Sequence, residues 1–215
     1  MKKPIFILLL IIPFFNTKPQ EIGELAPDKK PEEFPANAFG VDVMFSEGGV
    51  GLGTFYRRAV SQKVTLFGDI SLSESKDDQE FDYYDIFGNP IPVNGKKNRV
   101  FLVPLNLGVQ YRLFESVIYD NLRPYLNMGV GPSLVFTTPY DKEYFDAFGK
   151  AHANYAVGGY AGFGANFGLD KSNLIGVNLR YYVIHLFNEG VETLYGKHRK
   201  DVGGIFLTLN FGFMY

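Results

Sequence analysis

The chain has 215 residues, which is enough for one domain with a buried core. It contains no cysteine, so a disulfide scaffold, a thiolate zinc site, a cysteine nucleophile and a lipidated cysteine are all excluded. A net charge of −2 excludes a basic nucleic-acid-binding module. The mean hydropathy of −0.04 favours a soluble protein when it is read as an average, but the period of the apolar residues reverses that conclusion.

The first twenty residues differ from the rest. Met1–Lys3 is basic, and residues 5–15 form an apolar run that is too short for a membrane helix of about 20 residues. We expect residues 1–20 to be a secretory signal peptide, with an uncleaved N-terminal anchor as the alternative. Residues 21–35 combine proline with mixed charges and predict an extended periplasmic linker. Without residues 1–20, 18 basic and 23 acidic residues remain, a net charge of −5.

From residue 36 onward the apolar residues alternate with polar or small ones. Phe39, Val41 and Val43 alternate with Gly40 and Asp42, for example. This period of two indicates β-strands, and no convincing helical period follows residue 20. Residues 50–58 show the pattern most weakly. The sequence predicts eight strands: 36–45, 50–58, 63–73, 98–114, 122–136, 153–168, 174–187 and 202–215.

The composition of the polar face indicates which way the apolar face points. A soluble β-protein exposes a face rich in lysine and glutamate, whereas a membrane barrel exposes its apolar face to lipid and keeps polar or small residues inside. Here the polar face is rich in Gly, Asn, Thr and Ser, and aromatic residues gather near strand ends. Both features favour the lipid-facing arrangement, with the interfacial aromatic girdles of membrane barrels.

The lengths of the connections favour the same arrangement. The first, third, fifth and seventh connections have about 4, 24, 16 and 14 residues, and the second, fourth and sixth about 4, 7 and 5. Outer-membrane barrels have short periplasmic turns and longer external loops. Because open edges are costly in lipid, we expect the first and last strands, 36–45 and 202–215, to pair and close the barrel.

The last strand ends the chain on an aromatic residue, with apolar residues at alternate positions before it. It resembles the C-terminal signal of bacterial outer-membrane barrels, and residues 179–182 with Asn188 resemble the penultimate strand of the generic outer-membrane β-barrel domain. Residues 36–215 therefore look like the small eight-stranded outer-membrane proteins of the OmpX, OmpA-barrel and OmpW kind. The resemblance implies an all-β, eight-stranded antiparallel up-and-down transmembrane barrel in the outer membrane of a Gram-negative cell. It also implies a monomer whose C-terminal strand is read by the barrel assembly machinery through Leu209, Phe211, Phe213 and Tyr215.

The polar residues expected inside the barrel form the first candidate site. Buried charges need partners, so the charged members should pair with one another or with the neighbouring amides. One interpretation is a polar plug that holds the barrel shut, and the other is a narrow polar pathway or gate. An eight-stranded barrel has little interior room, which favours the plug. The residues are Asp42, Asp69, Asn106, Gln110, Arg112, Asn127, Asn178 and Arg180.

His185 is the second candidate, because the segment from His185 to Asn188 is similar to the lipid A deacylase barrels. In those enzymes a serine two residues after the histidine is the nucleophile. Phe187 occupies that position here and cannot attack an ester, so we expect no catalysis. The glycines between Gly158 and Gly168 match no phosphate-binding fingerprint, because no helix is predicted after them.

Two long loops are candidates for an extracellular partner. Loop 74–97 holds six acidic residues without the spacing of a calcium loop, together with aromatic residues that are costly to leave in water. Loop 137–152 contains Tyr140, Tyr144, Phe145 and Phe148. No metal or cofactor is expected. We predict a structural or surface-interaction role, with a small channel for small or apolar solutes as the alternative and a lipid-modifying enzyme as a weaker one.

Overall fold

The computed structural model describes residues 34–76, 83–84, 86–87, 90–91, 95–118, 121–168 and 171–215. The signal peptide expected over 1–20 and the linker expected over 21–35 lie outside the described residues, apart from Phe34 and Pro35. Most of the acidic residues of loop 74–97 also lie outside them.

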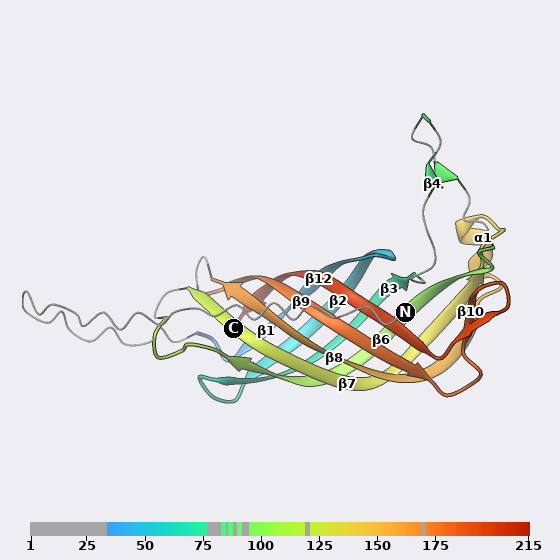
Figure 1. Ribbon diagram of the computed structural model, residues 1–215. Coiled ribbons are helices and arrows are strands. Elements are labelled where there is room, and N and C mark those ends of the chain that lie inside the picture. Colours follow the sequence, from blue (N-terminus) through green and yellow to red (C-terminus); the bar gives the residue numbers. More distant parts are fainter. Residues whose placement is uncertain are drawn as a thin grey trace, which may run out of the picture.

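Eight long strands form a closed antiparallel barrel (Figure 1). Each strand pairs with the next long strand along the chain, and the last pairs with the first, so the predicted up-and-down barrel is confirmed. The largest difference in bounds is the end of the fifth long strand, which was expected at residue 136 and lies at Pro139. The strands are β1 (Asn37–Ser46), β2 (Gly49–Ala59), β3 (Val64–Ser75), β6 (Asn98–Arg112), β7 (Leu122–Pro139), β8 (His152–Phe167), β9 (Asn173–Leu186) and β12 (Asp201–Met214).

The two ends of the barrel differ. At the short-turn end the connections are residues 60–63, 113–121 and 168–172, and both termini of the barrel lie there. At the long-loop end the connections carry further elements, on the right in Figure 1. These elements are the hairpin of β4 (Tyr83–Tyr84) and β5 (Pro90–Ile91), helix α1 (Tyr144–Phe148), and the hairpin of β10 (Val191–Leu194) and β11 (Lys197–Arg199).

Helix α1 was not expected from the sequence. It has only five residues, so it is too short to produce a helical period that a sequence window could detect. Phe148 of α1 packs on Phe101 of β6 with ring centroids 5.3 Å apart. Phe101 is therefore buried, although its position in the alternation places it on the outer face. Among the described residues, no helix is both long and apolar enough to cross a membrane.

The pairing of β1 with β12 closes the barrel. Val41 lies opposite Phe211 and Val43 opposite Leu209. At the short-turn end, the Asn37 amide donates to the Tyr215 carbonyl oxygen at 3.1 Å, and the Tyr215 amide donates to Asn37 at 2.9 Å. The backbone groups of the first and last strands are thus paired, and the barrel has no open edge along this seam.

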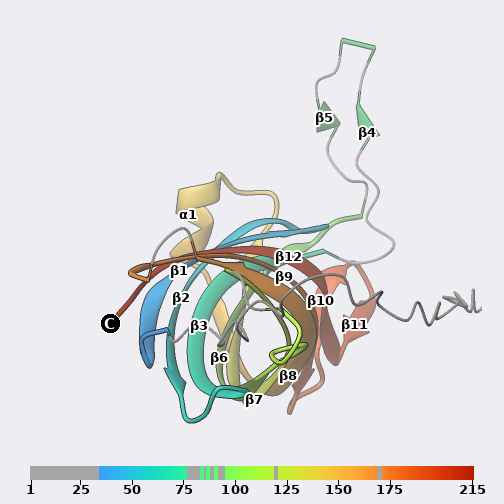
Figure 2. The same cartoon turned by 90° about the vertical axis from the view of Figure 1, so that its left-hand side faces the viewer.

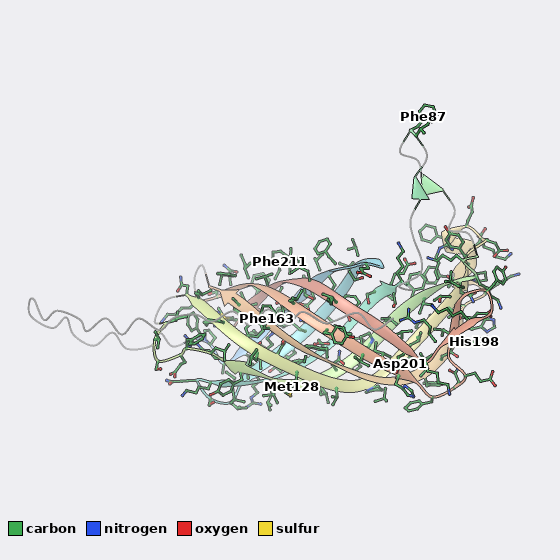
Figure 3. The ribbon with its side chains drawn as sticks, in the orientation of Figure 1. Phe87, Met128, Phe163, His198, Asp201 and Phe211 are labelled. Carbon is green, nitrogen blue, oxygen red and sulfur yellow. The ribbon has the colours of Figure 1, made fainter. Side chains whose placement is uncertain are left out.

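The outer face of the barrel is apolar and the inner face carries the polar side chains. Met128, Phe163 and Phe211 point away from the barrel (Figure 3), and Met128 is 65% exposed. On the neighbouring inward positions, Asn127 and Asn210 are buried. A soluble β-barrel has the reverse arrangement, with apolar side chains inside and polar side chains outside.

A substitution at Gly40 tests how closely β1 and β12 pack where they close the barrel. Gly40 faces Gly212 across β1 and β12, and a Cβ added to it would lie 2.1 Å from the Phe211 carbonyl oxygen. We expect Gly40→Val to lower the free energy of unfolding by about 1–3 kcal/mol, because the backbone must shift to accept the side chain. Urea unfolding in micelles, followed by the heat-modifiable gel shift, measures this. Gly149→Ala is the control, since its added Cβ makes only an ordinary 3.5 Å contact. Equal stability of the two variants would contradict the tight seam.

Candidate functional site

A charged triad lies in the middle of the barrel lumen. Arg180 of β9 reaches across to two carboxylates, with its NH2 atom 3.0 Å from Asp42 Oδ2 of β1 and its NH1 atom 3.8 Å from Asp69 Oδ2 of β3. All three side chains are almost completely buried. No two of the strands β1, β3 and β9 are neighbours, and β3 and β9 lie on opposite sides of the barrel, so the triad links distant parts of the wall.

Neutral donors complete the coordination of both carboxylates. Asn106 Nδ2 donates to Asp69 Oδ1 at 2.8 Å, and the Tyr160 hydroxyl donates to Asp69 Oδ2 at 2.9 Å. Asn210 Nδ2 donates to Asp42 Oδ1. Each of the four carboxylate oxygens therefore accepts a hydrogen bond, which offsets the cost of burying the charges. Tyr160 and Asn210 were not among the residues singled out from the sequence.

The remaining predicted polar residues divide into two groups. Asn127 and Asn178 lie beside Gly162 in the lumen, since a Cβ on Gly162 would lie 2.7 Å from Asn127 Oδ1 and 3.0 Å from Asn178 Oδ1. Asn127 Nδ2 also lies 3.5 Å from the Tyr160 hydroxyl. Gln110 and Arg112 lie apart from the triad, near the short-turn end. The structure thus brings together six of the eight residues, which we call the charged layer: Asp42, Asp69, Asn106, Asn127, Asn178 and Arg180. Gln110 and Arg112 lie outside this layer.

An aromatic layer adjoins the charged triad. The rings of Tyr160 and Tyr182 are 4.7 Å apart, Phe67 stacks on Tyr160 at 5.9 Å, and Phe206 meets Tyr182 edge-on at 5.2 Å. The Arg180 guanidinium lies 5.0 Å from the centre of the Tyr160 ring. These four aromatic side chains occupy inward positions. The sequence signal for them was an aromatic residue on the otherwise small or polar side of the alternation.

Apolar side chains fill the lumen beyond the aromatic layer, toward the long-loop end. Val191 of β10 belongs to this cluster, so the β10–β11 hairpin helps to cover the lumen. The cluster also contains Met44, Val100, Leu102, Val135, Ala156, Ile184, Leu186 and Val202. Sequence reasoning placed only small and polar residues inside the barrel and missed this apolar half.

Glu192 holds the β10–β11 hairpin to the start of β6. Its carboxylate forms an ion pair with Lys97 and accepts a hydrogen bond from the Gly196 amide at 2.6 Å. The Lys97 amide donates to the Thr193 carbonyl oxygen, and Asn98 Nδ2 to that of Glu192, both at 2.7 Å. The Lys97 hydrogen bond, followed by that of Gly196, holds the pKa of Glu192 below its ordinary value.

A cavity of about 370 Å³ opens at the short-turn end, on the other side of the charged layer. We call it the vestibule. Arg57, Arg112 and Arg123 line it, together with Gln110 and Tyr125. The Tyr125 hydroxyl donates to Asn210 Oδ1 at 3.4 Å, and Asn210 Nδ2 donates to Asp42 Oδ1, so the floor of the vestibule joins the charged layer.

His185 lies on the outer wall at the long-loop end. Its Nδ1 atom is 2.7 Å from Asp201 Oδ1 on the neighbouring strand, and both side chains are more than half exposed. Phe187, at the position of the nucleophile in the lipid A deacylases, is 70% exposed and carries no hydroxyl. Among the described residues no hydroxyl group is hydrogen-bonded to His185.

The aromatic end of β12 lies on the outer face. Phe211, Phe213 and Tyr215 are exposed, and Phe39 of β1 packs beside Phe213 and Tyr215 with ring centroids 5.9 and 6.1 Å apart. Leu209 lies on the same face and is partly exposed. The residues expected to carry the assembly signal thus form one outward row.

No protein-family model and no curated protein sequence matches the chain. Solved structures resemble it at low identity. The N-terminal β-barrel domain of Pseudomonas aeruginosa OprF is 13% identical, with 85% of this chain and 100% of that one covered and a TM-score of 0.45. Neisserial surface protein A is 9% identical (85% and 97% covered, TM-score 0.49), and Ail of Yersinia pestis is 12% identical (82% and 96% covered, TM-score 0.40). At these identities the likeness concerns the fold alone.

The charged triad yields a stability prediction. Arg180→Met leaves two buried carboxylates without their cation, and we expect it to lower the free energy of unfolding by roughly 3–5 kcal/mol. Adding Asp42→Asn and Asp69→Asn to this variant should restore most of the loss, because no uncompensated charge then remains. Urea unfolding in micelles measures the free energy of unfolding of the unmodified protein and of both variants. Arg58→Met, an exposed arginine on β2, serves as the control. A small loss for Arg180→Met, equal to that of the control, would argue against the triad.

Glu192 yields a pH prediction. Because its pKa is lower in the folded protein, its contribution to hairpin stability is complete above the ordinary value of 4.5 and is lost as the pH falls through the depressed value. We expect the Gly196 and Lys97 amides to exchange faster with deuterium at acidic pH, beyond the intrinsic change in exchange rate. Glu192→Gln should remove this extra pH dependence, whereas Glu189→Gln, nearby and exposed, should preserve it. Unchanged protection at low pH would contradict the role of Glu192.

Proposed function

We propose that this protein is a closed eight-stranded barrel of the bacterial outer membrane, with a structural or surface-interaction role and no catalytic activity. The observation that carries the proposal is the combination of an apolar outer wall with a filled lumen. The first feature suits lipid, and the second opposes the passage of solutes.

The outer wall supports the membrane location. Large apolar side chains are exposed on every barrel strand, among them Val41, Leu107, Val130 and Leu207. In water such a surface would far exceed the apolar patches that monomeric soluble proteins expose. In a bilayer it is matched by the acyl chains, and the closed ladder leaves no open strand edge toward lipid. The long loops would then face the cell exterior, as in outer-membrane barrels.

The lumen supports a role other than conduction. A solute entering from the vestibule meets the layer of Asp42, Asp69 and Arg180, then the rings of Tyr160 and Tyr182, and then the apolar cluster. Opening a path would break ion pairs and aromatic contacts across several strands at once. A channel for small or apolar solutes is the rival function, and the vestibule is the feature that favours it.

Apolar side chains at the long-loop end support a surface interaction. Phe87, at the tip of the projecting hairpin in Figure 3, is 82% exposed, and the preceding residue Ile86 is 93% exposed. Phe145 of α1 is 85% exposed and Tyr195 of the β10–β11 turn is 70% exposed. Exposed aromatic side chains are typical anchors of protein contacts, because they bury a large area on binding. An extracellular partner of loops 74–97 and 137–152 remains part of the proposal.

Because side chains fill the lumen, we expect the protein to conduct no ions. In a planar bilayer the purified protein should show no steady, reproducible open state. Replacing Tyr160, Tyr182 and Phe206 with alanine removes three inward rings and should produce or raise conductance. The matched control replaces three outward aromatic residues, Phe163, Tyr181 and Phe211, with alanine and should stay closed. A steady open state of the unmodified protein would instead establish the channel function.

A further inference from the structure

The described lining of the vestibule is positively charged. Figure 2 looks along the barrel from the short-turn end, at which the vestibule opens. Three arginines lie in its wall, Arg57 from β2, Arg112 from β6 and Arg123 from β7. The described lining residues include no aspartate or glutamate. In the charged layer deeper in the lumen, the four oxygens of Asp42 and Asp69 accept hydrogen bonds from Arg180 and from neutral donors of the layer. Among the described residues, neither carboxylate forms an ion pair with an arginine of the vestibule.

Arg57 is the most informative of the three. It is buried, with only 6% of its surface exposed. Its NH1 atom donates to Asn166 Oδ1 at 3.2 Å, and its guanidinium lies 4.2 Å from the centre of the Phe55 ring and 6.0 Å from that of Tyr125. Within the described part of the chain, no carboxylate comes within ion-pair distance of it. A buried guanidinium normally has an anionic partner, because one amide oxygen compensates little of its charge.

The other two arginines surround the same space. Arg112 NH2 donates to the Ile118 carbonyl oxygen at 3.4 Å, and its buried Nε atom has no hydrogen-bond partner among the described residues. Glu115 lies close enough to attract Arg112, but it pairs with Lys63 at 3.8 Å and is absent from the described lining. The Arg123 guanidinium lies over the Phe34 ring at 3.8 Å. Planar guanidinium groups bind carboxylates and phosphates through paired hydrogen bonds.

The size and the remaining lining limit the ligand. A cavity of about 370 Å³ lies at the lower end of the range for small-molecule sites, and Phe34, Leu174 and Met214 add apolar surface beside the arginines. We propose that the vestibule binds a compact organic anion, a small dicarboxylate or a phosphate monoester, with Arg57 as its principal charged contact. A barrel closed by its central layer can still hold a ligand in a vestibule that ends there, so such a site would add a binding activity to the structural role proposed above.

The test is a calorimetric titration of the full-length protein in micelles with succinate and with glycerol 3-phosphate. We expect saturable binding of at least one of the two. Arg57→Gln should weaken it roughly tenfold or more, because a charge-assisted contact is lost. Arg58→Gln removes the same charge from the next residue, which points to the outer face, and should leave the affinity unchanged. If Arg57→Gln fails to show the heat-modifiable gel shift of the folded barrel, Arg57→Lys replaces it and should weaken binding while keeping the charge.

Three results would overturn the proposal. The first is the absence of saturable binding for both anions, and the second is equal affinity in the variants of Arg57 and Arg58. The third is equal binding of the uncharged analogue succinamide, which would mean that charge is not recognised.

A separate variant tests whether acidic residues of the chain itself occupy the vestibule. Five acidic residues that precede the lining residue Phe34 are changed to glutamine: Glu21, Glu24, Asp28, Glu32 and Glu33. We expect unchanged affinity. A gain of more than tenfold would assign the vestibule to the chain's own carboxylates instead.

Discussion

A ladder of eight strands that closes on itself leaves an interior that side chains alone can fill. The seam between β1 and β12 imposes this closure, and the alternation of side chains then gives every residue of a strand one of two environments. Residues on one side must suit the surroundings of the barrel, and those on the other must pack into a narrow core. Gly40, Gly162 and Gly212 follow from the same constraint, because a side chain at these positions would meet backbone or amide atoms across the wall.

The lumen satisfies the constraint differently along its length. In the middle, Arg180 lies between two carboxylates whose four oxygens all accept hydrogen bonds, so no carboxylate oxygen is buried without a donor. Toward the long-loop end, aromatic and aliphatic side chains replace them. Toward the short-turn end the packing stops, and a vestibule remains with the buried Arg57, which has no carboxylate partner among the described residues. One end of the barrel is therefore sealed by packing, while the other retains the chemistry of a binding site.

The barrel was predictable because a period of two is strong over long strands, and the order of loop lengths indicated which end carries the long connections. The candidate site was predictable only in part. Asp42, Asp69 and Arg180 stand out as charges on a face of small residues, but Tyr160 and Asn210 acquire their roles from strands that meet only in the closed barrel. Helix α1 has too few residues to show a period, and the apolar half of the lumen was hidden because Met44 and Ile184 break the rule that polar residues point inward. Arg112 lies on the expected face but beyond the reach of the acids in the layer.

If the outer wall meets lipid and the lumen between the charged layer and the long-loop end excludes water, the two faces of β12 differ in which reagents can reach them. The chain has no cysteine, so no native cysteine has to be removed before labelling. Single cysteines carrying nitroxide labels can therefore be placed at consecutive positions of β12 from Ile205 to Leu209. In bilayers, labels at Ile205, Leu207 and Leu209 should be accessible to oxygen, and labels at Phe206 and Thr208 should be shielded from both oxygen and a water-soluble nickel complex. Access of the nickel complex to the second set would mean an open lumen. Its access to the first set would mean that the wall does not face lipid.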